Sequence, residues 1–442
     1  MLYKLHTNIL IVGLLTIGFL TVLAAEKAFC VMTAGTVVAF IAQIGLVLFY
    51  SREKKVSYSG KELFWVVLGY SIWLGIIFMM ISYYYAGDTF MLSKNDALLY
   101  YENSIRSHDI GFIANAKRLM TLYDPEDLGA LIFDSALMAI IPSKIFLNAV
   151  YALTGALSAV MLFRMGKYFM PEAYAYLASL TYGTSSYLIF FHCSFLKESI
   201  FVFLVISAVF FFYKAVVDGK KFSYVWTVLF LVLILFFRPA VTALLTVAFL
   251  LYLAIIQRGR AISVFLYIAI AILAPIAIVK MQDLVFSYTR GNMDAIVEHG
   301  RVYEYSSSFS WFVSWFAAPF GPFPSLFPRV AGEPLTTNFY GAGLIYRLFL
   351  IIPMWMGVWY AINEHETKII PLAVYVVISM LAAGYVLASL ELRKVMTHIP
   401  FTYILAFYGL YHWEKRERKL ITEPVFHLYT IGVLLLWTLI RG

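Results

Sequence analysis

Residues 62–85 read ELFWVVLGYSIWLGIIFMMISYYY, and only the first of these side chains is charged. A helix of this length rises far enough to cross the hydrocarbon core of a bilayer, which is about 30 Å thick. Comparable apolar runs recur along the chain, and charged residues gather in short clusters between them. The pattern predicts an all-α fold, a polytopic integral membrane protein in which residues 1–442 form a single transmembrane domain.

The composition of the whole chain indicates the same class. Hydrophobic residues account for 62% of the sequence and charged residues for 13%, and both values differ strongly from those of soluble domains. The net charge is +8, but no basic stripe with interleaved aromatic residues lies outside the apolar runs, so we expect no nucleic-acid partner. Cys30 and Cys193 are too few for a disulfide framework and are not in a metal-ligand spacing.

The apolar runs predict about thirteen transmembrane helices. Their approximate ranges are 7–25, 28–50, 62–85, 142–163, 172–191, 196–213, 222–237, 239–257, 261–279, 342–362, 369–389, 396–412 and 424–440. One long kinked helix through Arg238-Pro239 is the alternative to two separate spans there, and it would lower the count by one. The first run is long for the apolar core of a cleaved signal peptide and another run follows at once, so we expect it to be a retained helix.

Clusters of lysine and arginine in the short loops predict the orientation of the chain. They occur at 52–61, 164–167, 214–221, 258–260 and 415–419, on every second connection. Short loops rich in these residues face the cytoplasm, so the N-terminus is predicted to be cytoplasmic. The two long connections, 86–141 and 280–341, then lie on the extracytoplasmic side. Apolar periodicity, as in residues 109–123, predicts short amphipathic helices within these connections, at the membrane interface.

Several ionisable residues lie at predicted helix ends on the outer side. They are Asp88, Lys197, Glu198, Arg238, Glu391, Arg393 and Lys394. Such groups are costly near membrane depth and usually face a protein interior or a water-filled cavity. Each one alone can be an interfacial anchor or a solvated pair. Together, a carboxylate beside several cations suits an anionic substrate, because arginine binds phosphate through two parallel hydrogen bonds and lysine supplies a point charge.

The second long connection combines cations with aromatic residues, among them Arg290, Arg301, Trp311 and Trp315. Phosphates pair with such cations and sugars stack on such rings, although an aromatic belt at the membrane interface has the same composition. The histidines are scattered without metal-ligand spacing, so no metal site is predicted. No nucleotide-binding glycine motif is present in the sequence.

Short motifs and their order resemble the GT-C class of membrane glycosyltransferases, in particular bacterial members encoded with surface-polysaccharide genes. The motifs are Gly87-Asp88-Thr89, Asp96 followed by Tyr100 and Tyr101, Asp124-Pro125, Lys197-Glu198, Arg238-Pro239, Ala318-Pro319-Phe320 and the stretch 391–400. The resemblance is one of layout over most of the chain. The sequence departs from the class pattern in two ways: the first long outer loop follows the third predicted helix, and Thr89 replaces the glutamate of a frequent Asp-Glu pair.

The resemblance implies an inverting glycosyltransferase of the bacterial cytoplasmic (inner) membrane, which acts on the outer side in cell-surface glycan assembly. It implies a polyprenyl-phosphate-linked sugar donor and a glycan or lipid-linked acceptor, with membrane lipids around the protein. Asp88 is the first candidate for the general base and Asp96 the second. The lysines and arginines of the outer side would hold the leaving phosphate. No cofactor is implied, and a requirement for a divalent cation stays open.

Three other functions are compatible with the same sequence features. A polysaccharide polymerase would join lipid-linked repeat units on the same side of the membrane and would also use outer-loop arginines. A flippase or transporter of lipid-linked saccharide would place charges along the membrane interior rather than at the outer helix ends. A structural membrane scaffold would need no ionisable site at all.

Overall fold

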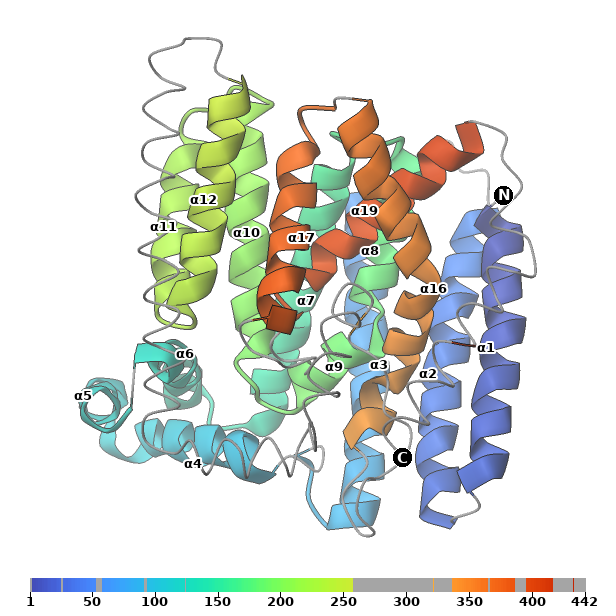
Figure 1. Cartoon of the computed structure of the whole chain (residues 1–442). Coiled ribbons are helices and arrows are strands. Elements are labelled where there is room, and N and C mark those ends of the chain that lie inside the picture. The colour runs from blue at the N-terminus through green and yellow to red at the C-terminus, as the bar shows by residue number, and fades with distance from the viewer. Residues whose placement is uncertain are drawn as a thin grey trace.

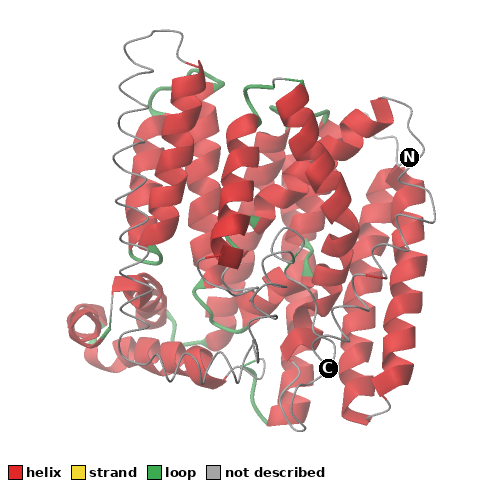
Figure 2. Cartoon of the chain, in the orientation of Figure 1, coloured by secondary structure: helices red, strands yellow, loops and turns green. Residues whose placement is uncertain are grey.

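The computed structural model describes residues 2–24, 27–52, 58–90, 94–123, 125–256, 321, 336–364, 366–385, 395–415 and 432. Within these ranges the chain forms helices joined by turns and short loops, and no strand is present (Figure 2). The helices are α1 (Leu2–Ala24), α2 (Lys27–Arg52), α3 (Gly60–Ala86), α4 (Lys94–Ile110), α5 (Phe112–Leu122), α6 (Pro125–Ile140), α7 (Lys144–Gly166), α8 (Glu172–Gly183), α9 (Ser186–Cys193), α10 (Glu198–Val216), α11 (Ser223–Leu235), α12 (Pro239–Ile256), α16 (Thr336–Asn363), α17 (Ile370–Tyr385) and α19 (Ile399–Lys415).

Five described helices are long and apolar enough to cross a membrane, namely those that contain Gly35–Arg52, Gly60–Tyr84, Lys144–Gly166, Glu198–Val216 and Gly341–Asn363. Shorter apolar helices accompany them in the bundle (Figure 1). The all-helical, multi-pass character predicted from the sequence is therefore supported. The predicted span at 261–279 lies outside the described residues, as does the span at 424–440 except for Gly432, so the count of thirteen stays a prediction.

The predicted span 172–191 is broken into two helices. α8 ends at Gly183 and α9 begins at Ser186, so Thr184 and Ser185 interrupt the run. Both side chains bond back to the preceding turn: the Thr184 hydroxyl donates to the Leu180 carbonyl at 2.7 Å and the Ser185 hydroxyl to the Thr181 carbonyl at 2.9 Å. Hydroxyl groups that compete for backbone carbonyls in this way favour the end of a helix.

The kinked-helix alternative at Arg238-Pro239 is wrong. α11 and α12 are separate helices that lie side by side, joined by a turn at 236–238 (Figure 1). Proline supplies no backbone N–H, and it suits the first position of a helix, where that donor would have no intrahelical acceptor. Pro239 accordingly begins α12, and Arg238 is placed at the turn between the two helices.

The first long connection folds into α4, α5 and α6 at one end of the bundle, where α3 ends and α7 begins (Figure 1). α5 confirms the helix predicted from the periodicity of residues 109–123. Its apolar side chains Ile113, Met120 and Leu122 are exposed, whereas Asn115 is buried and donates to the Ser135 hydroxyl at 3.0 Å. A helix with polar contacts inside and apolar residues outside suits a position against lipid.

The bundle has one large hydrophobic core, to which residues from α1 to α19 contribute. α16 and α19 cross very closely, because Gly357 faces the Leu405 carbonyl and Gly409 faces the Pro353 carbonyl with no room for a Cβ atom. Small residues allow the backbones of membrane helices to approach in this manner. The second predicted connection, 280–341, lies outside the described residues except for Gly321 and the first turns of α16.

Candidate functional site

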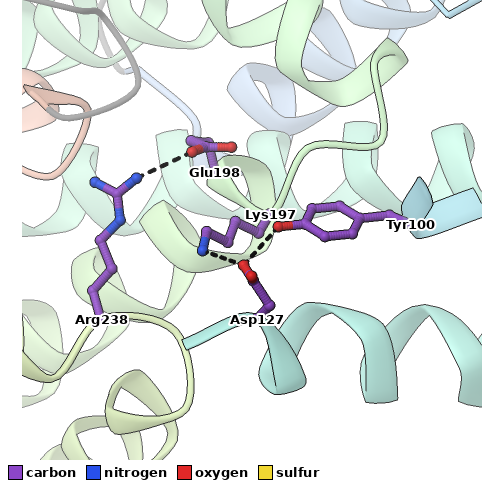
Figure 3. Close-up of polar contacts among 5 residues, drawn as sticks. All are labelled: Tyr100, Asp127, Lys197, Glu198 and Arg238. Atoms are coloured by element: carbon purple, nitrogen blue, oxygen red, sulfur yellow. Dashed lines mark hydrogen bonds and ion pairs between the residues drawn. The ribbon is translucent and has the colours of Figure 1, made fainter. Parts of the chain in front are cut away.

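An ion pair links the start of α10 to the first turn of α6. The Lys197 ammonium nitrogen lies 2.6 Å from Oδ1 of Asp127, and the Tyr100 hydroxyl of α4 donates to the same oxygen at 2.7 Å (Figure 3). The side chain of Lys197 is 10% exposed and that of Asp127 is 37% exposed. Three segments that are distant in sequence are thus joined at one carboxylate.

A second ion pair begins at the next residue of α10. Nη2 of Arg238 lies 3.2 Å from Oε1 of Glu198, whose side chain is fully buried (Figure 3). The guanidinium also lies over the ring of Phe201, 5.5 Å from its centroid. A buried carboxylate is tolerated when it is paired or hydrogen-bonded, and Arg238 contributes to this compensation of Glu198.

The loop between α9 and α10 positions both charged side chains. Phe195 in this loop has φ 54, a left-handed backbone conformation that is strained for a bulky residue. The packing that holds it there is aromatic: its buried ring contacts Phe90 and Tyr101 at centroid distances of 5.9 Å each. Lys197 and Glu198 follow directly, at the N-terminus of α10.

Asp88 lies where α3 ends. Gly87 has φ 69 and caps the helix by donating its N–H to the Tyr83 carbonyl at 2.9 Å, a role that favours glycine. Oδ1 of Asp88 then accepts the Phe90 N–H at 2.8 Å. Lys144, at the start of α7, donates to the Thr89 hydroxyl at 2.6 Å and is close enough to Asp88 for an electrostatic interaction. Asp88 therefore has a cationic neighbour that the sequence analysis did not identify.

Helix α4 connects the surroundings of Asp88 with the two ion pairs. The ring of Tyr101 packs against Phe90 with a centroid distance of 5.5 Å, while its neighbour Tyr100 contacts Asp127. Burial raises the pKa of the Tyr100 hydroxyl, and the negative charges of Asp127, Glu198 and Asp96 raise it further. Tyr100 thus keeps its proton and serves as a donor, and Asp96, the second predicted base, lies within electrostatic reach of it.

Asp127 and Asp134 were missed by the sequence analysis. The available signal for Asp127 was its place two residues after Pro125, since acidic residues are enriched in the first turn of a helix. Asp134 lies seven positions further along α6, is buried, and accepts the Tyr151 hydroxyl at 2.5 Å. Nothing in the local sequence distinguishes Asp134 from other polar residues of an amphipathic helix.

The two ion pairs have no net formal charge, because each contains one cation and one carboxylate. The predicted excess of cations over carboxylates stays a prediction, because Arg290, Arg301, Arg393 and Lys394 lie outside the described residues. Chemically, the arrangement combines carboxylates that can accept a proton with cations that can bind an anion. Within the described ranges, no group of His, Cys, Asp and Glu side chains could hold a metal ion.

The structure thus brings Asp96, Lys197, Glu198 and Arg238 together and places Asp88 next to Lys144 in the adjoining region. Five other predicted site residues lie outside the described residues, namely Arg290, Arg301, Glu391, Arg393 and Lys394. Their predicted roles stay predictions.

Comparison of the sequence with models of known protein families found no match. Comparison with curated proteins also found none. The function proposed below is accordingly argued from the side chains and their geometry.

Proposed function

We propose that this protein is a membrane glycosyltransferase that transfers a sugar from a polyprenyl-phosphate-linked donor on the extracytoplasmic side, in the assembly of a cell-surface glycan. The observation that carries the proposal is the pairing of Lys197 with Asp127 and of Glu198 with Arg238 at the end of the bundle formed by α4, α5 and α6. Such costly charges near an apolar bundle favour a functional site over a scaffold.

The reaction needs a base and a group that stabilises the leaving phosphate. A carboxylate takes the proton of the acceptor hydroxyl while the oxygen attacks the anomeric carbon, and the bond from that carbon to the phosphate oxygen breaks with its electron pair. Asp88 is the first candidate for the base and Asp96 the second, and the structure adds Asp127 as a third carboxylate of the same region.

The cations have the complementary role. As negative charge develops on the leaving phosphate, Lys197 and Arg238 stabilise it. An arginine has five N–H donors in a fixed fork, so its guanidinium can bind a carboxylate and a phosphate oxygen at the same time. The contact of Arg238 with Glu198 through Nη2 is compatible with this dual role. Lys144 is a third cation of this region, next to Thr89 and Asp88.

A flippase or transporter of lipid-linked saccharide is a second candidate, favoured by one specific observation. Arg347 is buried within α16, in the interior of a candidate membrane span. Charges in the membrane interior are the feature expected of a transporter, whereas the site residues predicted from the sequence lie at helix ends and in the long connections. A polysaccharide polymerase would act on the same side of the membrane as the transferase and would use the same kind of charged residues. The test must therefore distinguish the transferase, the polymerase and the flippase or transporter.

The test is the profile of polyprenyl-linked and surface glycans in cells that lack the gene, complemented with the wild type or with Asp88→Asn, Asp96→Asn or Asp127→Asn. Asp109→Asn on the exposed side of α4 is the matched control. Asparagine retains an acceptor oxygen for the Phe90 N–H, so Asp88→Asn removes the charge without removing the turn. Protein levels in the membrane are measured for every variant.

A glycan short by one sugar, restored by the control but not by one of the three site variants, is the expected result for the transferase, and that variant identifies the base. Complete single units on the surface without longer chains would indicate a polymerase. Complete units retained on the cytoplasmic leaflet would indicate a flippase. An unchanged profile in cells that lack the gene contradicts all three functions.

A further inference from the structure

Arg347 is a buried cation separate from the two ion pairs described above. Its side chain belongs to α16 and is 2% exposed. The residue lies within the candidate membrane span Gly341–Asn363. Guanidinium groups keep their proton in proteins, so a full positive charge lies inside the bundle.

The hydrogen bonds of Arg347 leave most of its donors without an acceptor. Nη1 donates to the Gly321 carbonyl at 2.6 Å. Nε and Nη2 are buried and have no acceptor among the residues that the structure describes, and no described carboxylate forms an ion pair with this arginine. A buried charge with one neutral hydrogen bond is strongly destabilising unless an anion compensates it.

Polar groups without negative charge surround the guanidinium. Tyr187, Tyr403 and His398 are buried and close enough to Arg347 for electrostatic interaction. The Tyr187 hydroxyl donates to the Tyr403 hydroxyl at 2.9 Å, and the Ser185 hydroxyl lies 3.4 Å from the same oxygen. Because Tyr187 and Ser185 donate their protons to Tyr403 and to the Thr181 carbonyl, the hydroxyl that can donate to an anion near Arg347 is that of Tyr403.

The break between α8 and α9 lies next to Arg347 and adds to the positive potential. The Ser186 hydroxyl at the start of α9 accepts the Gly343 N–H at 2.8 Å, and Gly343 precedes Arg347 by one turn of α16. The N-terminus of α9, which carries a partial positive charge, therefore contacts α16 one turn before Arg347. Broken membrane helices commonly place such ends at anion sites.

We propose that Arg347 binds an oxyanion, a phosphate group carried by a membrane lipid or a free phosphate ion, with the Tyr403 hydroxyl as a further hydrogen-bond donor. The bound anion neutralises the buried guanidinium and accepts hydrogen bonds from Nε and Nη2. The site does not depend on the transferase function, because it shares no residue with the Lys197–Asp127 and Glu198–Arg238 pairs.

The test is thermal unfolding of the purified full-length chain. In neutral detergent, the melting temperature is measured with increasing inorganic phosphate. In the same detergent, which contains no phosphate group, it is measured with and without added phosphatidic acid. A ligand that binds only the folded state raises this temperature. The variants are Arg347→Met, Tyr403→Phe and, as the matched control at an exposed arginine, Arg164→Met.

A rise with inorganic phosphate identifies a free ion, and a rise with phosphatidic acid alone identifies a lipid headgroup. Either rise is expected for the wild type and for Arg164→Met, and it should be lost in Arg347→Met. Tyr403→Phe should weaken binding about tenfold through the loss of one hydrogen bond. If Arg347→Met does not fold, the weaker phosphate binding of Tyr403→Phe tests the proposal in its place.

Two results would overturn the proposal. One is the absence of any rise in the wild type with both ligands, and the other is a rise that persists unchanged in Arg347→Met and Tyr403→Phe. The variant without ligand gives an independent reading. An uncompensated guanidinium predicts that Arg347→Met melts at a higher temperature than the anion-free wild type. A lower melting temperature of this variant, together with no ligand effect on the wild type, would mean that a carboxylate of the chain itself pairs with Arg347.

Discussion

The ammonium nitrogen of Lys197 lies 2.6 Å from Oδ1 of Asp127, although the two residues are 70 positions apart in the chain. The contact joins the N-terminus of α10, a candidate membrane-spanning helix, to the first turn of α6. The second ion pair, between Glu198 and Arg238, begins one residue later and fastens the same point of α10 to the turn before α12. The start of α10 is thus the point at which three parts of the candidate site meet.

The first prediction concerns the coupling of Lys197 and Asp127. We expect Lys197→Met and Asp127→Asn each to lower the free energy of unfolding. The double variant should lower it by less than the sum of the two single losses. The coupling energy should be about 0.5–3 kcal/mol, the range for residues in direct contact. Denaturant unfolding of the four proteins in detergent measures it. Purely additive losses would show that the pair makes no net contribution.

The second prediction concerns the buried carboxylate of Glu198. Arg238→Met removes a cationic partner of this carboxylate and should cost up to about 3–5 kcal/mol, because the buried charge of Glu198 is then less well compensated. Lys167→Met is the control, since the Lys167–Glu172 pair has side chains that are 44% and 39% exposed and should contribute less than about 1 kcal/mol. Equal losses for both variants, measured by the same unfolding assay, would contradict the burial argument.

The third prediction follows from Asp134. Desolvation by burial raises the pKa of this carboxyl from 3.8 to about 7, and the hydrogen bond from Tyr151 opposes the shift. The folded state therefore retains a proton that the unfolded state releases, so the stabilising contribution is complete below about pH 4 and is lost as the pH rises to about 7. The difference of about 3 in pKa corresponds to about 4 kcal/mol.

Asp134→Asn should remove this dependence while retaining an acceptor for Tyr151. We expect the melting temperature of the variant, relative to the wild type, to increase between about pH 5 and pH 8. Glu172→Gln, an exposed first-turn acid of α8, is the control and should change the profile little. Parallel profiles for the wild type and Asp134→Asn would mean that Asp134 is ionised throughout this range.

The fourth prediction concerns the crossing of α16 and α19. A Cβ atom at Gly357 would collide with the Leu405 carbonyl, and one at Gly409 with the Pro353 carbonyl. We expect Gly357→Ala and Gly409→Ala each to cost about 1–3 kcal/mol, the range for overpacking. Gly69→Ala in α3 has open space around the new methyl group and should stabilise the helix slightly. Thermal unfolding compares the three variants, and a neutral Gly357→Ala would contradict the close crossing.

The sequence alone determined the class of the fold, because an apolar run such as 62–85 has few stable alternatives to a membrane helix. A helix within 109–123, observed as α5 (Phe112–Leu122), was predictable for a related reason, since helical periodicity matches only one regular structure. The individual cations and carboxylates at the helix ends, such as Lys197, Glu198 and Arg238, were predictable as candidates because charge near membrane depth is costly. All of these are local properties of composition and spacing.

The partners of those charges were decided by the tertiary structure. Nothing near Lys197 in the chain indicates Asp127, and nothing near Glu198 indicates Arg238, because both pairs form only when distant helices pack at the same end of the bundle. The break between α8 and α9 and the burial of Arg347 have the same origin. The surroundings of a hydroxyl or a guanidinium within an apolar run cannot be predicted from the run itself, because the packing of neighbouring helices determines whether the group contacts lipid, another side chain or a bound anion.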